Sequence, residues 1–213
     1  MTDVFPISGK YIAAAIIFFA IIVCIAFMII PIIGAYNGLV NADLQVQKCD
    51  SNIRTDLVRR ADLIPNLVAV VSGSVNFEKS TLVEVIGMRA QATKIKEQVK
   101  SARSIDDIQQ SQDEIGAVIG RLLMLTENYP QLQSTQQFRD LSAQITATEN
   151  QILQDRQTYN LAVMQYQRIV RSFPTNLVAG FYNFDADKYS LFKPMDETRA
   201  YAVPIISFAI GSI

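Results

Sequence analysis

The chain opens with a long apolar stretch, and a repeating pattern of apolar and polar positions follows it. Residues 11–33 include no charged side chain. As a helix this stretch would be roughly 35 Å long, enough to cross a hydrocarbon core about 30 Å thick. A cleaved signal peptide would have a shorter apolar region, about 7–15 residues, and a small residue where bulky Ile33 stands. We therefore predict a permanent transmembrane helix over 11–33 behind an N-terminal tail of residues 1–10.

Beyond residue 33 the apolar positions recur at alternating intervals of three and four residues. This 3.5-residue repeat is typical of helix bundles and coiled coils. Nine of the eleven positions at this spacing in residues 138–173 are apolar or aromatic. Residues 36–71 follow the same repeat less regularly, because the charged residues Asp43, Asp50 and Arg60 interrupt it. We predict that these two sets of positions form the buried seam of a bundle.

Two shorter amphipathic segments lie between the long ones, around residues 82–99 and 105–122. Four helical segments with short connections pack most simply as an up-down-up-down antiparallel bundle. We therefore predict an all-α fold in which the transmembrane helix leads into an antiparallel four-helix bundle over 34–173. A mostly irregular tail, 174–213, follows it.

Local signals predict where some helices begin and end. Ser104 precedes Asp107 by three residues, the spacing of a capping box, in which each side chain accepts a hydrogen bond from the other's backbone N–H. Ser134 and Gln137 repeat this spacing, so a second helix start is expected there. The Ser-Gly-Ser run at 72–74 predicts a turn.

Composition excludes most familiar kinds of enzyme. The chain has no histidine, which is the commonest general base near neutral pH and the commonest metal ligand. Its formal net charge of −1 lacks the basic excess of a nucleic-acid-binding protein. Cys24 and Cys49 form no CxxC pair, so neither a zinc site nor a disulfide framework is indicated. No cofactor, metal or catalytic residue is predicted.

Several short motifs, in order and in register from about residue 36 to 189, resemble the LemA family. The residues that carry the resemblance are Tyr36-Asn37, the run from Arg59 to Val68 (RRADLIPNLV), Glu127 to Pro130, Thr148 to Asn150, Arg156 with Tyr159-Asn160, and Phe173-Pro174. The resemblance implies a membrane-anchored antiparallel four-helix bundle of bacteria with no established enzymatic activity, some of whose relatives are tied to membrane remodelling. Gln167 departs from the family's usual asparagine, and the apolar end of the tail is also unusual.

The charges close to Pro65 form the first candidate site. Pro65 lacks a backbone donor, which predicts a kink in its helix or a break near residues 63–64. Arg59 and Arg60 at such a kink would suit an anionic headgroup or a partner's carboxylate. Alternatively, polar residues on an apolar seam fix the register of a bundle by pairing across it. The charges that would pair on this second interpretation are Arg60, Asp62, Glu149, Asp155 and Arg156.

The C-terminal tail is the second candidate site. Its apolar and aromatic residues would either lie on the bilayer surface or pack against a neighbouring subunit, since contiguous apolar patches usually mark contacts. The residues concerned are Phe181, Tyr182, Phe184, Tyr189, Phe192, Tyr201, Val203, Ile205, Ile206 and Phe208.

Together these observations predict a non-enzymatic, membrane-anchored scaffold that self-associates and organises membrane or recruits a protein partner. The expected partners are the lipid bilayer and further copies of the chain, and no nucleic acid. The resemblance places it in the bacterial cytoplasmic membrane as a single-pass protein. Lys48 and Arg54 on one side of the span, against Lys10 on the other, favour a cytoplasmic bundle. The alternative is a sensory or signalling bundle on the external side of the membrane.

Overall fold

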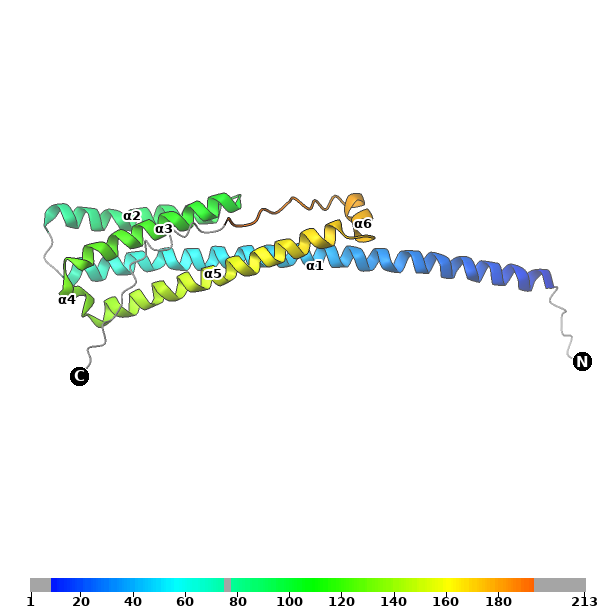
Figure 1. Ribbon diagram of the computed structural model, residues 1–213, viewed down its shortest axis with the longest axis horizontal. Coiled ribbons are helices and arrows are strands. Elements are labelled where there is room, and N and C mark those ends of the chain that lie inside the picture. Colours follow the sequence, from blue (N-terminus) through cyan, green and yellow to red (C-terminus); the bar gives the residue numbers. More distant parts are fainter. Residues whose placement is uncertain (1–8, 75–77, 194–213) are drawn as a thin grey trace, which may run out of the picture. The chain divides into compact units, whose positions relative to one another are not determined.

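The computed structural model describes residues 9–74 and 78–193, and all regular structure among them is helical (Figure 1). The all-α prediction is thus confirmed for these residues. The helices are α1 (Gly9–Ser74), α2 (Lys79–Ser101), α3 (Ile105–Glu127), α4 (Pro130–Gln133), α5 (Gln136–Arg171) and α6 (Thr175–Phe181). The chain forms two compact units. The first unit comprises residues 1–45 and 164–189, and the second comprises 46–163 and 190–213.

Helix α1 contains the apolar stretch and continues past it without a break. Every side chain from residue 15 to residue 34 is exposed. Among the described residues, α1 is the one helix long and apolar enough to cross a bilayer. Because a continuous apolar surface of this length is unfavourable in water, the helix indicates membrane anchoring.

In the second unit, residues 46–74 of α1 pack with α2, α3 and the first part of α5. Arg54 bonds the carbonyl of Val99 near the end of α2, and Asp62, two turns further along α1, pairs with Lys96, which comes earlier in α2. Helices α1 and α2 are therefore antiparallel. The seam predicted for α1 and α5 is confirmed here by burial. The seam positions of this unit with at most 2 % of their surface exposed are Val46, Ile53, Leu57, Ile64, Leu67, Val71, Phe138, Ile152 and Tyr159.

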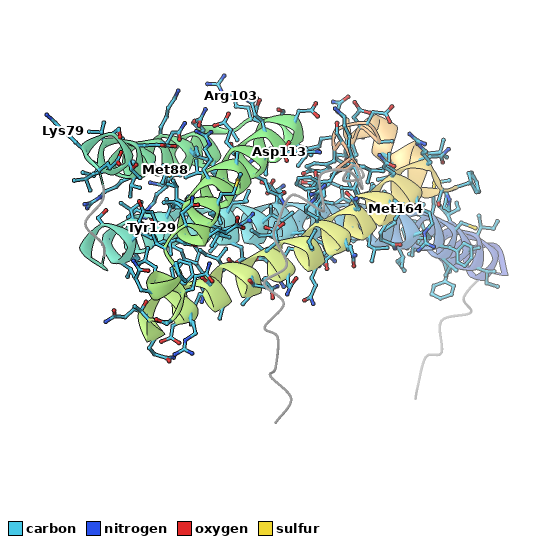
Figure 2. The ribbon with its side chains drawn as sticks, turned by 60° about the vertical axis from the view of Figure 1, so that its left-hand side comes forward. Lys79, Met88, Arg103, Asp113, Tyr129 and Met164 are labelled. Atoms are coloured by element: carbon cyan, nitrogen blue, oxygen red, sulfur yellow. The ribbon has the colours of Figure 1, made fainter. Side chains whose placement is uncertain are left out.

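Helices α2 and α3 contribute the other two faces of this core. Met88 of α2 is buried, whereas Lys79 and Arg103, near the two ends of the same helix, are exposed (Figure 2). On α3 the predicted apolar positions Ile108 and Ile115 are fully buried. The amphipathic pattern of both short segments therefore faces the core as predicted.

One of the two predicted capping boxes is present. Ser104 Oγ accepts from the Asp107 backbone N–H at 3.1 Å, and Asp107 Oδ2 accepts from the Ser104 N–H at 3.0 Å. At the start of α5 the prediction was wrong by one residue. Thr135 Oγ1 accepts from the Phe138 N–H, while Ser134 is occupied as the C-cap of α4 and donates its hydroxyl to the Gln131 carbonyl.

Two predicted interruptions of α1 do not occur. The helix continues through Pro65, so the break expected near residues 63–64 is absent. Proline removes one backbone donor only, and the buried neighbours Ala61, Ile64 and Val68 hold the helix in place by packing. The helix also extends through the Ser-Gly-Ser run at 72–74, where a turn was predicted.

The first unit contains the end of α5 and the short helix α6, which the sequence pattern did not predict. α5 ends at Arg171, and Phe173 at the end of its predicted seam is 79 % exposed rather than buried. Asn183 takes a left-handed conformation (φ 58°) after α6, and the Phe184 N–H bonds the Ala179 carbonyl. This is the 6→1 bond of a Schellman motif, and asparagine tolerates the left-handed position well.

Candidate functional site

A buried ion pair joins α1 to α5 in the second unit. Arg60, 4 % exposed, pairs with Glu149. Burial lowers the pKa of the Arg60 guanidinium, and the charge and hydrogen bond of Glu149 oppose that shift. Among the described residues, Arg60 Nε has no hydrogen-bond partner. This pair is one of those expected if polar residues on the seam pair across the bundle.

Arg156 is a second buried cation, on α5 about two turns beyond Glu149. Its Nη2 donates to the Lys193 carbonyl at 2.9 Å, and its Nη1 lies 3.4 Å from Gln112 Oε1 of α3. The guanidinium also lies over the Phe192 ring, 4.9 Å from its centroid. Burial lowers the pKa of Arg156, while the charges of Asp113 and Glu149 raise it. Arg156 therefore ties α5 to α3 and to the chain end of the described tail.

The other predicted charges have different neighbours. Asp62 pairs with Lys96 of α2 at 2.7 Å, on the exposed side of the bundle. Arg59 is exposed, and Pro65, six residues further along α1, is half-buried. Asp155 lies beside Asp56 of α1. The structure thus brings Arg60 and Glu149 together and leaves Asp62 and Asp155 out of that contact.

Asp56 and Asp155 form a carboxyl–carboxyl contact between α1 and α5. Burial, the hydrogen bond from Asp155 and the charge of Asp155 raise the pKa of Asp56 to about 6, and the nearby Arg59 charge lowers it in part. Two carboxylates at hydrogen-bond distance are stable when one proton lies between them. Hence the contact favours a proton on Asp56 below about pH 6.

The charged interruptions of the α1 repeat each have a specific role. Asp50 Oδ2 accepts from Arg54 Nε at 2.7 Å, and Arg54 Nη1 donates to the carbonyls of Val99 and Ala102 at 3.0 Å each. Arg54 therefore caps the C-terminal end of α2, where carbonyls lack partners and a positive charge is favourable. These contacts were not predicted, although the interruption of an apolar repeat was their visible signal.

Asp43 of α1 holds the segment that follows α6 in the first unit. Its Oδ1 accepts from Lys188 Nζ at 2.7 Å and from the Tyr189 hydroxyl at 2.9 Å. The Asp43 hydrogen bond raises the pKa of Lys188, and burial raises that of Tyr189. The Tyr166 hydroxyl donates to the Asp185 carbonyl at 2.9 Å. These bonds hold the segment after α6 against α1 and α5 within this unit.

An apolar groove lies in the first unit between α1 and α6. Its volume is about 430 Å³. The lining residues are Met28, Pro31, Ile32, Ala35, Pro174, Leu177, Val178, Phe181 and Tyr182. Aromatic rings gather at its side, with the Tyr36 ring centroid 4.7 Å from that of Tyr182 and 6.1 Å from that of Phe184.

The structure divides the predicted tail residues into three groups. Phe181 and Tyr182 are exposed, Phe184 and Tyr189 are half-buried, and Phe192 is buried against Tyr159 and Arg156 of its own unit. For Phe192 the structure therefore shows an internal contact instead of the membrane or subunit contact that we expected. The remaining predicted contacts lie outside the described residues: Tyr201, Val203, Ile205, Ile206 and Phe208.

Further polar residues of the second unit were not among the predicted site residues, and Asn160 of α5 is half-buried among them. Asn160 exchanges hydrogen bonds with the backbone of Phe192, accepting at 3.0 Å and donating at 3.4 Å. Ser111 and Gln112 are buried on α3. Asn160 belongs to one of the family motifs, which was its only signal. Among the described residues, no group of three or more Cys, Asp or Glu is placed to hold a metal ion.

The fold defines an all-α protein in which a long apolar N-terminal helix continues into packed helices joined by buried polar contacts. The LemA family model matches residues 50–208, and the chain belongs to the LemA family. It is 23 % identical over 203 residues to magnetosome proteins MamQ 1 and MamQ 2 of Paramagnetospirillum magneticum, covering 86 % of this chain and 74 % of each relative. It is 24 % identical over 164 residues to protein LemA of Metamycoplasma hominis, covering 77 % of this chain and 71 % of the relative.

The buried Arg60–Glu149 pair should show strong energetic coupling. Glu149→Gln leaves a buried guanidinium without its counter-charge, so we expect a loss of roughly 3–5 kcal/mol in the free energy of unfolding. Arg60→Met combined with Glu149→Leu should recover most of that loss. Denaturant unfolding of the parent protein, Arg60→Met, Glu149→Leu and the double variant completes a double-mutant cycle that measures the coupling. As a control, the exposed pair of Asp62 and Lys96 should couple by less than about 1 kcal/mol; zero coupling between Arg60 and Glu149 would contradict the pairing.

The carboxyl contact predicts pH-dependent stability. The pKa of Asp56 is about 6 in the folded protein against 3.8 ordinarily, so its stabilising proton is fully bound below pH 3.8 and is lost as the pH rises through 6. Asp56→Asn keeps a donor toward Asp155 without the repulsion. We expect it to raise the thermal midpoint by roughly 2–4 °C at pH 7.5, as for about 1 kcal/mol in a domain of this size, and to leave it nearly unchanged at pH 3.5. The exposed Asp140→Asn variant is the matched control; equal effects of Asp56→Asn at both pH values would argue against the shared proton.

Proposed function

We propose that this protein is a non-enzymatic scaffold, anchored by one transmembrane helix in the bacterial cytoplasmic membrane, that self-associates and organises membrane or recruits protein partners. The observation that carries the proposal is the exposed apolar surface of residues 15–34, which a bilayer would cover. The relatives' names, magnetosome protein and protein LemA, contain no reaction. They agree with a role in contact rather than in catalysis.

Exposed apolar side chains on the packed helices supply surface for self-association. Val83 and Ile86 of α2 are 64 % and 54 % exposed, and their spacing of three residues places them on one face of that helix. Met124 of α3 and Leu161 of α5 are exposed as well. Adjacent apolar residues on an exposed helix face commonly mark contacts with another chain. We propose the Val83 face of α2 as part of the contact between copies.

Self-association through this face predicts a particle larger than one chain. In mild detergent, mass photometry of the full-length protein should give a multiple of the 23.7 kDa chain mass after correction for the micelle. Val83→Glu with Ile86→Glu should shift the particle toward monomer, because two desolvated carboxylates oppose association. Gln91→Glu with Thr93→Glu adds the same charge to exposed positions of α2 and should leave the particle size unchanged. A strict monomer for the parent protein would contradict the scaffold.

The continuity of α1 favours one second candidate, a sensory or signalling bundle outside the cell. Helix α1 runs unbroken from the apolar stretch to residue 74, as the single anchor of a sensor would do. The positive-inside asymmetry favours the scaffold with a cytoplasmic bundle.

Topology separates the two candidates. A protease site inserted at residues 75–77, between α1 and α2, should remain uncut in intact spheroplasts when protease is added outside, and should be cut after lysis. Cleavage in intact spheroplasts would support the sensory bundle. The same insertion near the N-terminus should give the opposite pattern and serves as the control.

A further inference from the structure

We propose that the groove between α1 and α6 holds an acyl chain of a bilayer phospholipid, and that α6 lies at the membrane interface. The inference rests on the membrane anchoring in the proposed function and adds a lipid site to it. Its volume of about 430 Å³ lies within the range of small-molecule sites, about 300–1,000 Å³. Apart from the hydroxyl of Tyr182, the side chains that line it are apolar.

The wall formed by α1 identifies the occupant. Met28, Pro31 and Ile32 belong to the last two turns of the apolar run 11–33. From Met28 to Ala35 this wall rises about 10 Å along the helix, roughly a third of the hydrocarbon thickness of about 30 Å. A groove beside this part of the transmembrane helix is surrounded by lipid acyl chains. Hydrocarbon is therefore present there at a far higher concentration than any protein partner.

The aromatic rings beside the groove lie where the apolar run of α1 ends. Tyr36 lies one turn past Ile32, and its ring contacts that of Tyr182. The ring centroids of Phe181 and Tyr182 are 5.1 Å apart. Tyrosine is enriched where hydrocarbon meets headgroups, because its ring is apolar and its hydroxyl is polar. The cluster thus places α6 at the headgroup level when residues 11–33 span the bilayer.

The exposed side of α6, whose Leu177 and Phe181 also line the groove, has the residues of an interfacial segment. Leu177 and Phe181, four residues apart on one face, are 66 % and 81 % exposed, and Phe173 just before the helix is 79 % exposed. Arg168 and Arg171 in the last turn of α5 are also exposed. Arg171 pairs with Asp187, which is itself 79 % exposed, and pairs of this kind are weak. A lipid phosphate can therefore compete for these guanidinium groups.

The segment after α6 keeps this face turned outward. Lys188 and Tyr189 are bonded to Asp43, and Asp185 accepts from Tyr166, so the chain that leaves α6 is held within the first unit. Only Val178 and Ala179 of α6 are buried. The apolar face of Leu177 and Phe181 is consequently left for the bilayer.

The absence of tryptophan allows a test with single reporters. Full-length protein with Leu177→Trp is reconstituted in phosphatidylcholine vesicles with or without bromine on the acyl chains, which quenches tryptophan fluorescence on contact. We expect quenching close to that of Phe19→Trp in the apolar stretch, together with a blue-shifted emission. Gln144→Trp, on an exposed polar position of α5, should be neither quenched nor shifted.

The outcomes separate this inference from the anchoring on which it rests. No quenching at Phe19→Trp would overturn the membrane anchoring itself. Quenching at Phe19→Trp but not at Leu177→Trp would overturn the lipid site and leave the anchor intact. Shielded but unquenched Leu177→Trp would also overturn it. The occupant would then be a second copy if shielding grows with the protein-to-lipid ratio, or the chain's own end if deletion of residues 194–213 removes it.

Lipid retention tests the groove independently of the reporters. Native mass spectrometry in mild detergent should show the parent protein carrying an added mass equal to one phospholipid. Ala35→Phe fills the groove from the α1 side and should reduce this fraction at least about tenfold, equivalent to about 1.4 kcal/mol. Ala90→Phe adds the same bulk at an exposed position of α2 and should retain the lipid. Equal retention by Ala35→Phe would overturn the assignment of the groove, and circular dichroism checks that both variants remain helical.

Discussion

The burial of Arg60 is the constraint on which the arrangement of the second unit depends. A guanidinium removed from water costs several kcal/mol unless a counter-charge stays beside it. Glu149 supplies that charge from α5. Apolar seam residues would tolerate a slide of one helix along the other, because leucine, isoleucine and valine are similar in size and carry no direction. A slide of one turn, about 5.4 Å, would separate the ion pair. We therefore expect the pair to favour one register among the several that the apolar repeat alone allows.

Polar side chains of α5 also fix a segment that has no regular structure. The chain from residue 190 to 193 has no helix or strand of its own, yet Arg156, Tyr159 and Asn160 of α5 bond its backbone at Lys193, Ser190 and Phe192. Side chains of a helix thus satisfy backbone groups that would otherwise need water. The three residues share one side of α5, since they lie three and four positions apart. This segment is consequently held on the second unit with Phe192 buried, although its sequence is that of a tail.

The sequence predicted what depends on periodicity and missed what depends on single long-range bonds. The 3.5-residue repeat predicted the burial of Ile53, Leu57 and Tyr159, because burial of a helix face is a property of many positions together. It also predicted Arg60 as a polar position with a partner on α5. The contacts of Asp43 with Lys188 and Tyr189 span 145 and 146 residues and follow no local pattern. Of the kink or break predicted at Pro65, the break is absent, because tertiary packing outweighs the loss of one backbone donor.

The polar contacts of Asp43 bear on which apolar side chains of the first unit are exposed. Along α1, residues 15–34 are exposed all round, whereas from Leu39 onward only one face is apolar and that face is buried. α6 departs from this division, because it exposes Leu177 and Phe181 although the chain on both sides of it is held within the first unit. A loose segment would turn such side chains inward, since each buried leucine or phenylalanine contributes about 1.5–3 kcal/mol. Here Asp43, through Lys188 and Tyr189, holds the following segment in place. The exposed face of α6 is therefore a consequence of the fold, and a bilayer is the environment that would stabilise it.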